Sequence, residues 1–238
     1  MTAAPSPRAT ARPKTHVFFD FFGTLVDYDP SVHPASRNAP HEFAVRAGAP
    51  IDAPAASRLW ERAWLEVDGQ AASTGRECSM REIAERFSEL AGIAAPDAEL
   101  ECLVDDYLEA WTSGITLASG AEACLAALAP LHTLAVVSNA HDPRLVPRML
   151  RRFKIEHFFT DVITSVELGW RKPHPEIYRI ALERTAGSVD ATVFVGDTWE
   201  ADVAGPRALG MDAIYVGFPR RDRAAVGLAE VASLLGVG

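Results

Sequence analysis

Carboxylate, hydroxyl, amide and amine side chains follow four short apolar runs of this 238-residue chain, at the points where predicted strands end. A carboxylate at such a position can attack phosphorus or carbon and give a covalent intermediate that water then cleaves. Asp20, which ends the first run, is therefore the predicted nucleophile. In chain order the residues of this set are Asp20, Ser138 with Asn139, Lys172, and Asp197 with Asp202.

A divalent cation is expected beside the carboxylates of this set. Asp20, Asp197 and Asp202 would bring three negative charges to one place, where they repel each other and raise one another's pKa values. Mg²⁺ fits such a site, because it takes oxygen ligands and usually keeps waters and a substrate phosphate oxygen. The sequence thus predicts a Mg²⁺ cofactor and a small anionic substrate.

The elements that position these residues indicate an α/β fold. Val17–Phe19 is predicted to be a short buried strand, and Gly23 with Thr24 forms a sharp turn after Asp20. From residue 115 onward, strand and helix periods alternate, which predicts a Rossmann-like parallel sheet with helices on both faces. Ligands bind such sheets at the carboxyl ends of the strands. Further strands are expected at Thr133–Val137, Asp161–Thr164, Thr192–Val195 and Ala213–Val216, and helices at Ser119–Ala129, Arg144–Arg152, Pro175–Ala186, Ala201–Leu209 and Ala224–Leu235.

Helical periodicity interrupts this alternation once, which predicts an inserted all-helical cap. Residues 29–48 carry several prolines and are expected to form a loop. Ser79 and Glu82 have the spacing of a capping box, as do Ser119 and Glu122. The segment Asp68–Ser79 is polar and is either a surface loop or a link that reaches the substrate. Helices of the cap are expected at Ala55–Val67, Met80–Leu90 and Ala98–Trp111.

The predicted domain boundaries follow from this change of period. Residues 1–15 would be a disordered tail rich in Pro and Ala, and residues 30–114 would be the helical cap. Residues 16–29 and 115–238 would together form the α/β core. Such a cap would cover the catalytic edge of the sheet and exclude water.

The four motifs, in this order and spacing, resemble those of the haloacid dehalogenase-like hydrolase superfamily of the helical-cap type, over roughly residues 16–217. The resemblance implies hydrolysis of a small phosphorylated metabolite through an aspartyl-phosphate intermediate on Asp20. It also implies that Asp20 and Asp197 bind Mg²⁺ through their side chains, and Phe22 through its backbone carbonyl. Asp202 would support the metal or Lys172.

The same resemblance assigns roles toward the transferred group. Lys172 would balance the carboxylates and contact the phosphoryl group. Ser138 and Asn139 would donate hydrogen bonds to that group, which stabilises the charge of the transition state. Thr24 and Phe22 complete the expected substrate-binding set.

Several neighbouring residues are expected to have no catalytic role. Arg171, beside the lysine, should be solvated. His141 and Asp142 should be turn residues that cap the next helix. Trp60 and Trp64 recur at helical spacing and should belong to the core of the cap.

Phe22 departs from the family pattern. Phosphatases of this superfamily usually carry a second Asp two residues after the nucleophile, and this Asp protonates the leaving oxygen. Phenylalanine cannot transfer a proton, and losing a general acid–base group typically costs about 10²–10⁴ in rate. Three explanations stay open. The leaving group needs no acid, or a cap residue or water takes the place of the second Asp, or the chain catalyses a different reaction.

Two other functions stay open at this point. A halide leaves without a proton, so a 2-haloacid dehalogenase in which Asp20 attacks carbon would fit Phe22, although Asp197 and Asp202 follow the phosphatase form of the last motif. A non-catalytic phosphate-binding member is the other alternative, and the retained Asp20 argues against it. A phosphonatase is disfavoured because residues 31–113 contain no lysine for a Schiff base.

The amino-acid composition indicates which kinds of partner and which cellular compartment to expect. The formal net charge is −9, which argues against nucleic acid as a partner, because binding its backbone depends on Lys and Arg. The three cysteines lack metal-ligand spacing and suggest free thiols in a reducing, cytoplasmic setting. No apolar stretch is long enough to span a membrane. Formation of a homodimer stays open.

Overall fold

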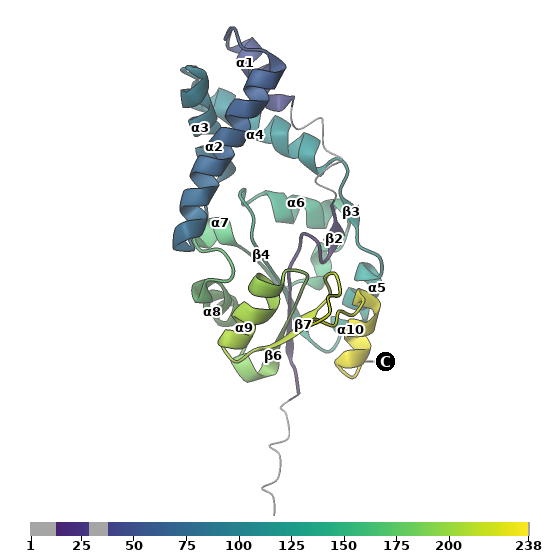
Figure 1. Ribbon diagram of the computed structural model, residues 1–238. Coiled ribbons are helices and arrows are strands. Elements are labelled where there is room, and N and C mark those ends of the chain that lie inside the picture. Colours follow the sequence, from purple (N-terminus) through teal and green to yellow (C-terminus); the bar gives the residue numbers. More distant parts are fainter. Residues whose placement is uncertain (1–12, 29–37, 238) are drawn as a thin grey trace, which may run out of the picture.

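Five parallel strands form the sheet that carries the predicted site residues. A computed structural model describes residues 13–28 and 38–237 of the chain (Figure 1). The strand order is β5-β4-β1-β6-β7, and Phe19 of the central strand lies opposite Val136 and Val195. All carboxyl ends meet at one edge, so the predicted α/β fold is confirmed. The strands are β1 (His16–Phe19), β4 (Thr133–Ser138), β5 (Asp161–Thr164), β6 (Thr192–Gly196) and β7 (Asp212–Tyr215).

Helices cover both faces of this sheet, and the alternation of side chains along β1 explains why. Val17 and Phe19 belong to one hydrophobic cluster and Phe18 to the other, and all three are fully buried. Burying a side chain of this kind contributes about 1.5–3 kcal/mol. The first cluster includes α5 (Ala121–Leu128), α6 (Leu145–Arg152) and α10 (Leu228–Leu234), and the second includes α8 (Pro175–Arg184).

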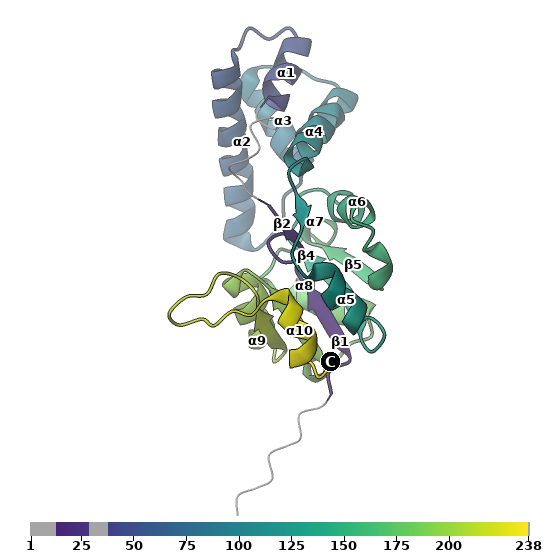
Figure 2. The ribbon, with the colours of Figure 1, turned by 90° about the vertical axis from the view of Figure 1, so that its right-hand side faces the viewer.

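Four helices follow β1 and lie beyond the carboxyl edge of the sheet (Figures 1 and 2). They are α1 (Ala39–Arg46), α2 (Ala53–Thr74), α3 (Met80–Ala91) and α4 (Asp97–Thr112), here called the helical insertion. A short antiparallel pair, β2 (Val26–Asp27) with β3 (Thr116–Leu117), joins the segments that lead into and out of it. Strands of two residues carry no periodic signal, which is why this pair is not among the predicted elements.

The ends of the longer inserted helices are set by side chains that satisfy exposed backbone groups. Asp52 Oδ1 accepts a hydrogen bond from the Ala55 N–H at 2.8 Å, which caps the start of α2. The capping box predicted at α3 is confirmed: Ser79 Oγ accepts from the Glu82 N–H at 3.2 Å, and Glu82 Oε2 accepts from the Ser79 N–H at 2.7 Å.

Two predictions within the insertion are wrong. The loop predicted at 29–48 contains α1, and its Pro40 sits in the first turn, where a helix needs no N–H donor. Residues 29–37 lie outside the described part of the chain. The predicted link Asp68–Ser79 is also mostly helical, since α2 continues to Thr74 and Gly69 does not interrupt it. A single glycine costs only about 1 kcal/mol in a helix, which packing can offset.

Further differences lie in the core. The capping box predicted for Ser119 and Glu122 is wrong, because α5 starts after Gly120 without a side-chain cap. The helix predicted at Ala201–Leu209 is instead a π-helical turn at Trp199–Ala204 followed by α9 (Gly205–Ala208). One further short helix, α7 (Ser165–Leu168), follows β5.

The amino-terminal segment is described from residue 13. The Thr15 N–H donates to the Ala191 carbonyl at 2.9 Å, and Lys14 Nζ lies 2.6 Å from Asp212, so the last residues of the expected tail contact the core. Residues 1–12 of that tail lie outside the described range. Among residues 13–28 and 38–237, no helix has both the length and the apolar character needed to cross a bilayer.

Candidate active site

Asp20, Lys172 and Asp202 form a buried row of charges at the carboxyl edge of the sheet. Lys172 Nζ lies 2.7 Å from Oδ1 of Asp20 and 2.7 Å from Oδ1 of Asp202. The three residues are only 7, 3 and 0% exposed, respectively. Since removing one partner of a buried ion pair typically costs about 3–5 kcal/mol, the lysine is fixed in place by its partners. The structure therefore brings together residues that are far apart in the sequence, as predicted.

The turn after β1 links the predicted nucleophile to the fourth motif. The Asp20 N–H donates to the Val195 carbonyl of β6 at 2.9 Å, which continues the strand pairing up to the nucleophile. Thr24 Oγ1 donates to Asp20 Oδ2 at 3.2 Å and lies 3.3 Å from Asp197 Oδ1. Thr24 is buried, so its hydroxyl holds two carboxylates rather than solvent. Its predicted contact with substrate stays a prediction.

Negative charge exceeds positive charge in this cluster. Burial raises the pKa of Asp197 to about 6, and the nearby charge of Asp20 adds to the effect. Burial also raises the pKa of Asp202 to about 7, against the opposing charge of Lys172. Burial alone would lower the pKa of Lys172, but the carboxylates of Asp20 and Asp202 outweigh it and raise that pKa. One lysine does not balance three carboxylates.

The donor atoms of this cluster fit a divalent cation. One carboxylate oxygen from each of Asp20, Asp197 and Asp202 lies within 4.8 Å of the others. A set of oxygen donors suits Mg²⁺, and the surplus negative charge is what such an ion would compensate. The carbonyl of Phe22 lies in the same turn, and its role as a ligand stays a prediction.

Ser138 and Asn139 end β4, the strand next to β1. Ser138 is fully buried, and its Oγ donates to the Asn139 carbonyl at 3.3 Å. The side chain of Asn139 makes two hydrogen bonds to the backbone of Lys172. Nδ2 donates to the lysine carbonyl at 3.1 Å, and Oδ1 accepts from the lysine N–H at 2.8 Å. Asn139 thus positions the segment that carries Lys172. The hydrogen bonds from Ser138 and Asn139 to a transferred group stay predictions.

A second cluster of charges connects the helical insertion to the core. Glu77, which follows α2, lies with Oε1 3.2 Å from His141 Nδ1 and contacts the guanidinium of Arg171. Arg171 Nη2 also lies 2.6 Å from Asp68 Oδ1 on α2. Ser165 of the core donates to Glu77 Oε2 at 2.6 Å. We call Asp68, Glu77, His141 and Arg171 the interface cluster. Asp68, Glu77 and His141 of this cluster, together with Cys78, have the proximity of metal ligands, but the guanidinium of Arg171 already supplies positive charge to both carboxylates.

These contacts correct two of the roles expected from the sequence. The prediction that Arg171 is solvated is wrong, since its side chain is only 15% exposed and pairs with two carboxylates. His141 is more than a turn residue, because it joins the interface cluster and its ring packs edge-on against Trp64 at 5.0 Å. Asp142 does lie in the turn before α6, where its Oδ1 accepts from the Arg144 N–H at 2.8 Å. The prediction that it caps this helix is wrong, because α6 starts after Arg144 without a side-chain cap.

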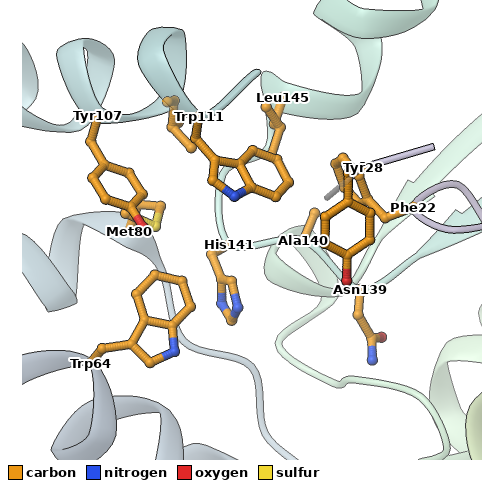
Figure 3. Close-up of a pocket in the computed structure, with 11 residues that line it drawn as sticks. Phe22, Tyr28, Trp64, Met80, Tyr107, Trp111, Asn139, Ala140, His141 and Leu145 are labelled. Carbon is orange, nitrogen blue, oxygen red and sulfur yellow. The ribbon is translucent and has the colours of Figure 1, made fainter. Parts of the chain in front are cut away.

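A cavity of about 300 Å³ lies between the helical insertion and the core, next to Phe22 (Figure 3). Trp64, predicted to be a core residue of the cap, contributes to its wall. Tyr28, Tyr107 and Trp111 also line the cavity, and no sequence motif marks them as site residues. Tyr107 and Trp111 lie on α4, where helical spacing does not reveal which side chains face a cavity, and Tyr28 follows β2 outside any periodic element. The residues around the cavity are Phe22, Tyr28, Trp64, Met80, Tyr107, Leu108, Trp111, Asn139, Ala140, His141 and Leu145.

The chain matches one family model over most of its length. The family model described as haloacid dehalogenase-like hydrolase matches residues 14–210 of the chain. A glyceraldehyde 3-phosphate phosphatase of Pyrococcus abyssi is 28% identical over 212 residues, covering 84% of this chain and 79% of that protein. A protein of the same description from Methanothermobacter thermautotrophicus is 35% identical over 85 residues. That match covers 36% of this chain and 37% of the relative. The chain therefore spans little more than a third of that relative's length.

Comparison with solved structures supports the fold. The chain is similar to a 2-haloacid dehalogenase from Pseudomonas syringae pv. Tomato, with a TM-score of 0.69 and 23% identity. The alignment covers 94% of this chain and 98% of the other. At this identity the likeness concerns the arrangement of the backbone.

Proposed function

Because the chain belongs to the haloacid dehalogenase-like hydrolase family, we propose that it hydrolyses a small phosphorylated metabolite in a Mg²⁺-dependent reaction through an aspartyl-phosphate intermediate. The observation that carries this proposal is the buried pairing of Lys172 with both Asp20 and Asp202 at 2.7 Å, beside Asp197. The phosphatase names of relatives that cover most of the chain add support.

Asp20 is the nucleophile in this proposal. A carboxylate oxygen of Asp20 attacks phosphorus, the bond to the leaving oxygen breaks, and water later hydrolyses the acyl phosphate. Lys172 holds one oxygen of Asp20 and Thr24 holds the other, so the carboxylate is oriented before the substrate arrives. The lysine also supplies positive charge near the oxygens of the transferred group.

Asp20, Asp197 and Asp202 would hold Mg²⁺, with the carbonyl of Phe22 as a further ligand. When bound, the ion supplies positive charge that compensates the carboxylates and the phosphoryl oxygens. Asp202 also accepts a hydrogen bond from the Thr198 N–H at 2.8 Å, so its side chain is fixed for this role from two sides. The helical insertion acts as the cap that excludes water from this edge of the sheet.

The dehalogenase alternative keeps support from one observation. Phe22 stands where a proton donor is expected, and its ring packs against Trp111 with centroids 5.3 Å apart. A halide needs no proton on leaving, so an apolar wall beside Asp20 suits attack on carbon as well. Asp197 and Asp202 favour the phosphatase, since in a metal-free reaction Lys172 alone would face three carboxylates.

The test uses purified protein and a panel of aryl phosphates, acyl phosphates, alkyl phosphates and 2-haloacids, each with Mg²⁺ and with EDTA. Phosphate release that disappears with EDTA and in Asp20→Asn is the expected result. Halide release that is insensitive to EDTA would establish the dehalogenase instead. Ligand binding without turnover, unchanged in Asp20→Asn, would identify a binding protein.

A further inference from the structure

Aromatic side chains dominate the wall of the cavity between the helical insertion and the core (Figure 3). Five of its lining residues are aromatic, namely Phe22, Tyr28, Trp64, Tyr107 and Trp111. Phe22, Tyr28 and Trp111 contact each other, with ring centroids between 5.3 and 6.3 Å apart. Such rings offer both faces and edges to a flat ligand, and stacked or edge-on ring pairs favour one another beyond simple burial.

The cavity adjoins the carboxylate cluster. Phe22 lies two residues after Asp20, and Asn139 binds the backbone of Lys172. Tyr28 packs against Phe22, with ring centroids 6.3 Å apart, so the aromatic wall begins at the turn that follows Asp20. A group that enters the cavity can therefore remain bonded to a phosphoryl group held at Asp20.

The polar part of the wall carries no surplus charge. His141 is the ionisable group that joins the aromatic wall to the interface cluster, and its Nδ1 lies 3.2 Å from Glu77. Behind the wall, Arg171 pairs with Glu77 and Asp68, and the ring of His141 also faces Glu77, so the carboxylates of this cluster are already paired. A charged ligand group would find no unpaired counter-charge in this cluster, and burying a charge without one is costly. The wall favours an uncharged ligand.

We propose that this cavity binds the leaving group of the substrate and that this group is a flat, uncharged ring, which makes the substrate an aryl phosphate. The inference rests on the proposed phosphatase function and names its substrate class. A volume of about 300 Å³ accommodates one or two rings and is at the lower end for small-molecule sites. Long or highly hydroxylated leaving groups fit neither this size nor this wall.

An aryl leaving group is consistent with Phe22, which cannot donate a proton. Asp20 attacks phosphorus, the bond between phosphorus and the aryl oxygen breaks, and the phenolate leaves with the electron pair. The phenolate then takes a proton from water. Because phenolates are weak bases compared with alkoxides, this step proceeds without a proton donor in place of Phe22.

The experiment compares two non-hydrolysable ligands that differ only in the ring. Phenylphosphonate and methylphosphonate are titrated into the full chain with Mg²⁺ by calorimetry, and aryl and alkyl phosphates are compared as substrates. We expect phenylphosphonate to bind about tenfold more tightly or better, because a ring is buried among rings. Trp111→Leu should reduce this ratio several-fold, and Trp111→Phe should retain most of it. Phe218→Leu, which changes an 87% exposed ring outside the cavity, is the control.

The outcomes separate this inference from the proposed function. Equal binding of both phosphonates, with phosphate release intact, would overturn the ring preference and leave the phosphatase standing. Ring preference without phosphate release would support the cavity assignment and contradict the phosphatase. If Trp111→Leu unfolds, Tyr107→Leu provides the second test, and a ratio unchanged in a folded variant would overturn the inference.

Discussion

A β-carbon placed on Gly23 would lie 2.5 Å from Oδ2 of Asp197. Gly23 also has a φ of 85°, which L side chains rarely adopt. Its N–H donates to the Val26 carbonyl at 2.8 Å and so closes the turn that follows Asp20. The backbone of the nucleophile turn therefore touches the carboxylate of the fourth motif, and a side chain would separate the two.

Gly23→Ala tests how much this close approach matters. We expect activity to fall at least tenfold and stability to drop by more than the conformational strain of about 1–2 kcal/mol, because the Asp197 carboxylate must also move. Gly48→Ala is the matched control, since its φ is 72° and no atom lies within 4 Å of its β-carbon. Urea unfolding and steady-state kinetics measure both effects. Equal losses in both variants would show that strain alone matters at Gly23.

Asp197→Asn tests the metal site. The change removes one negative charge and replaces one carboxylate oxygen with an amide nitrogen, in a cluster where one oxygen from each of three carboxylates lies within 4.8 Å of the others. We expect Mg²⁺ affinity to fall by at least tenfold and divalent-dependent turnover to be lost. Titration calorimetry with Mg²⁺ measures affinity, and EDTA treatment of the wild type gives the reference for turnover. Wild-type activity that survives EDTA would contradict the metal proposal.

The meeting of Asp20, Lys172 and Asp197 could be predicted from the sequence. Parallel strands place their carboxyl ends at one edge, so residues that follow different strands converge whatever the loops between them do. These strands can be predicted because β1, β4 and β6 are short apolar runs. At these strands, the apolar pattern of the local sequence agrees with the place of each strand in the sheet.

The interface cluster and the cavity could not be predicted in the same way. Arg171 meets Glu77 and Asp68 only because the helical insertion packs on the core. Such packing between distant segments produces no periodic pattern in the sequence of either one. Tyr28 and Trp111 come from different elements, and apolar spacing on a helix does not show what its buried face meets. The length of α2 cannot be predicted for a related reason, since packing offsets the cost of Gly69 within the helix.

His141→Gln tests the contribution of the interface cluster to stability. Burial alone would lower the pKa of His141, but its contacts with Cys78 and Glu77 outweigh burial and raise the pKa from 6.5 to about 10. The resulting stabilisation is fully present below pH 6.5, where the ring is protonated in both states, and is lost as pH rises through about 10. We expect the variant to lose about 2–3 kcal/mol at pH 6.

The measurement is the difference in the free energy of unfolding between wild type and His141→Gln, determined with urea at several pH values from 6 to 10. This difference should shrink toward the alkaline end. His157→Gln changes an exposed histidine and should show little loss at any pH. A constant difference across the range would mean that the ring matters through packing against Trp64 and not through its charge.

Phe22→Asp tests the missing proton donor. Without an acid, negative charge accumulates on the leaving oxygen, so the wild-type rate should fall steeply as the pKa of the leaving group rises. Aryl and acyl phosphates should be hydrolysed and alkyl phosphates should be slow. The introduced carboxyl group should flatten this dependence and raise the rate on alkyl phosphates by about 10²-fold, the lower end for a general acid.

The ring of Phe22 complicates this change, because it packs against Phe21, Tyr28 and Trp111 with centroids 4.9 to 6.3 Å apart. Phe22→Asn removes the same ring without adding an acid, so it separates lost packing from gained proton transfer. Thermal unfolding of both variants checks that the loss of stability is shared. Flattening in Phe22→Asp but not in Phe22→Asn is the expected result. A wild type that hydrolyses alkyl and aryl phosphates equally fast would show that another group already donates the proton, and His141 and Tyr28 on the cavity wall are the residues to change next.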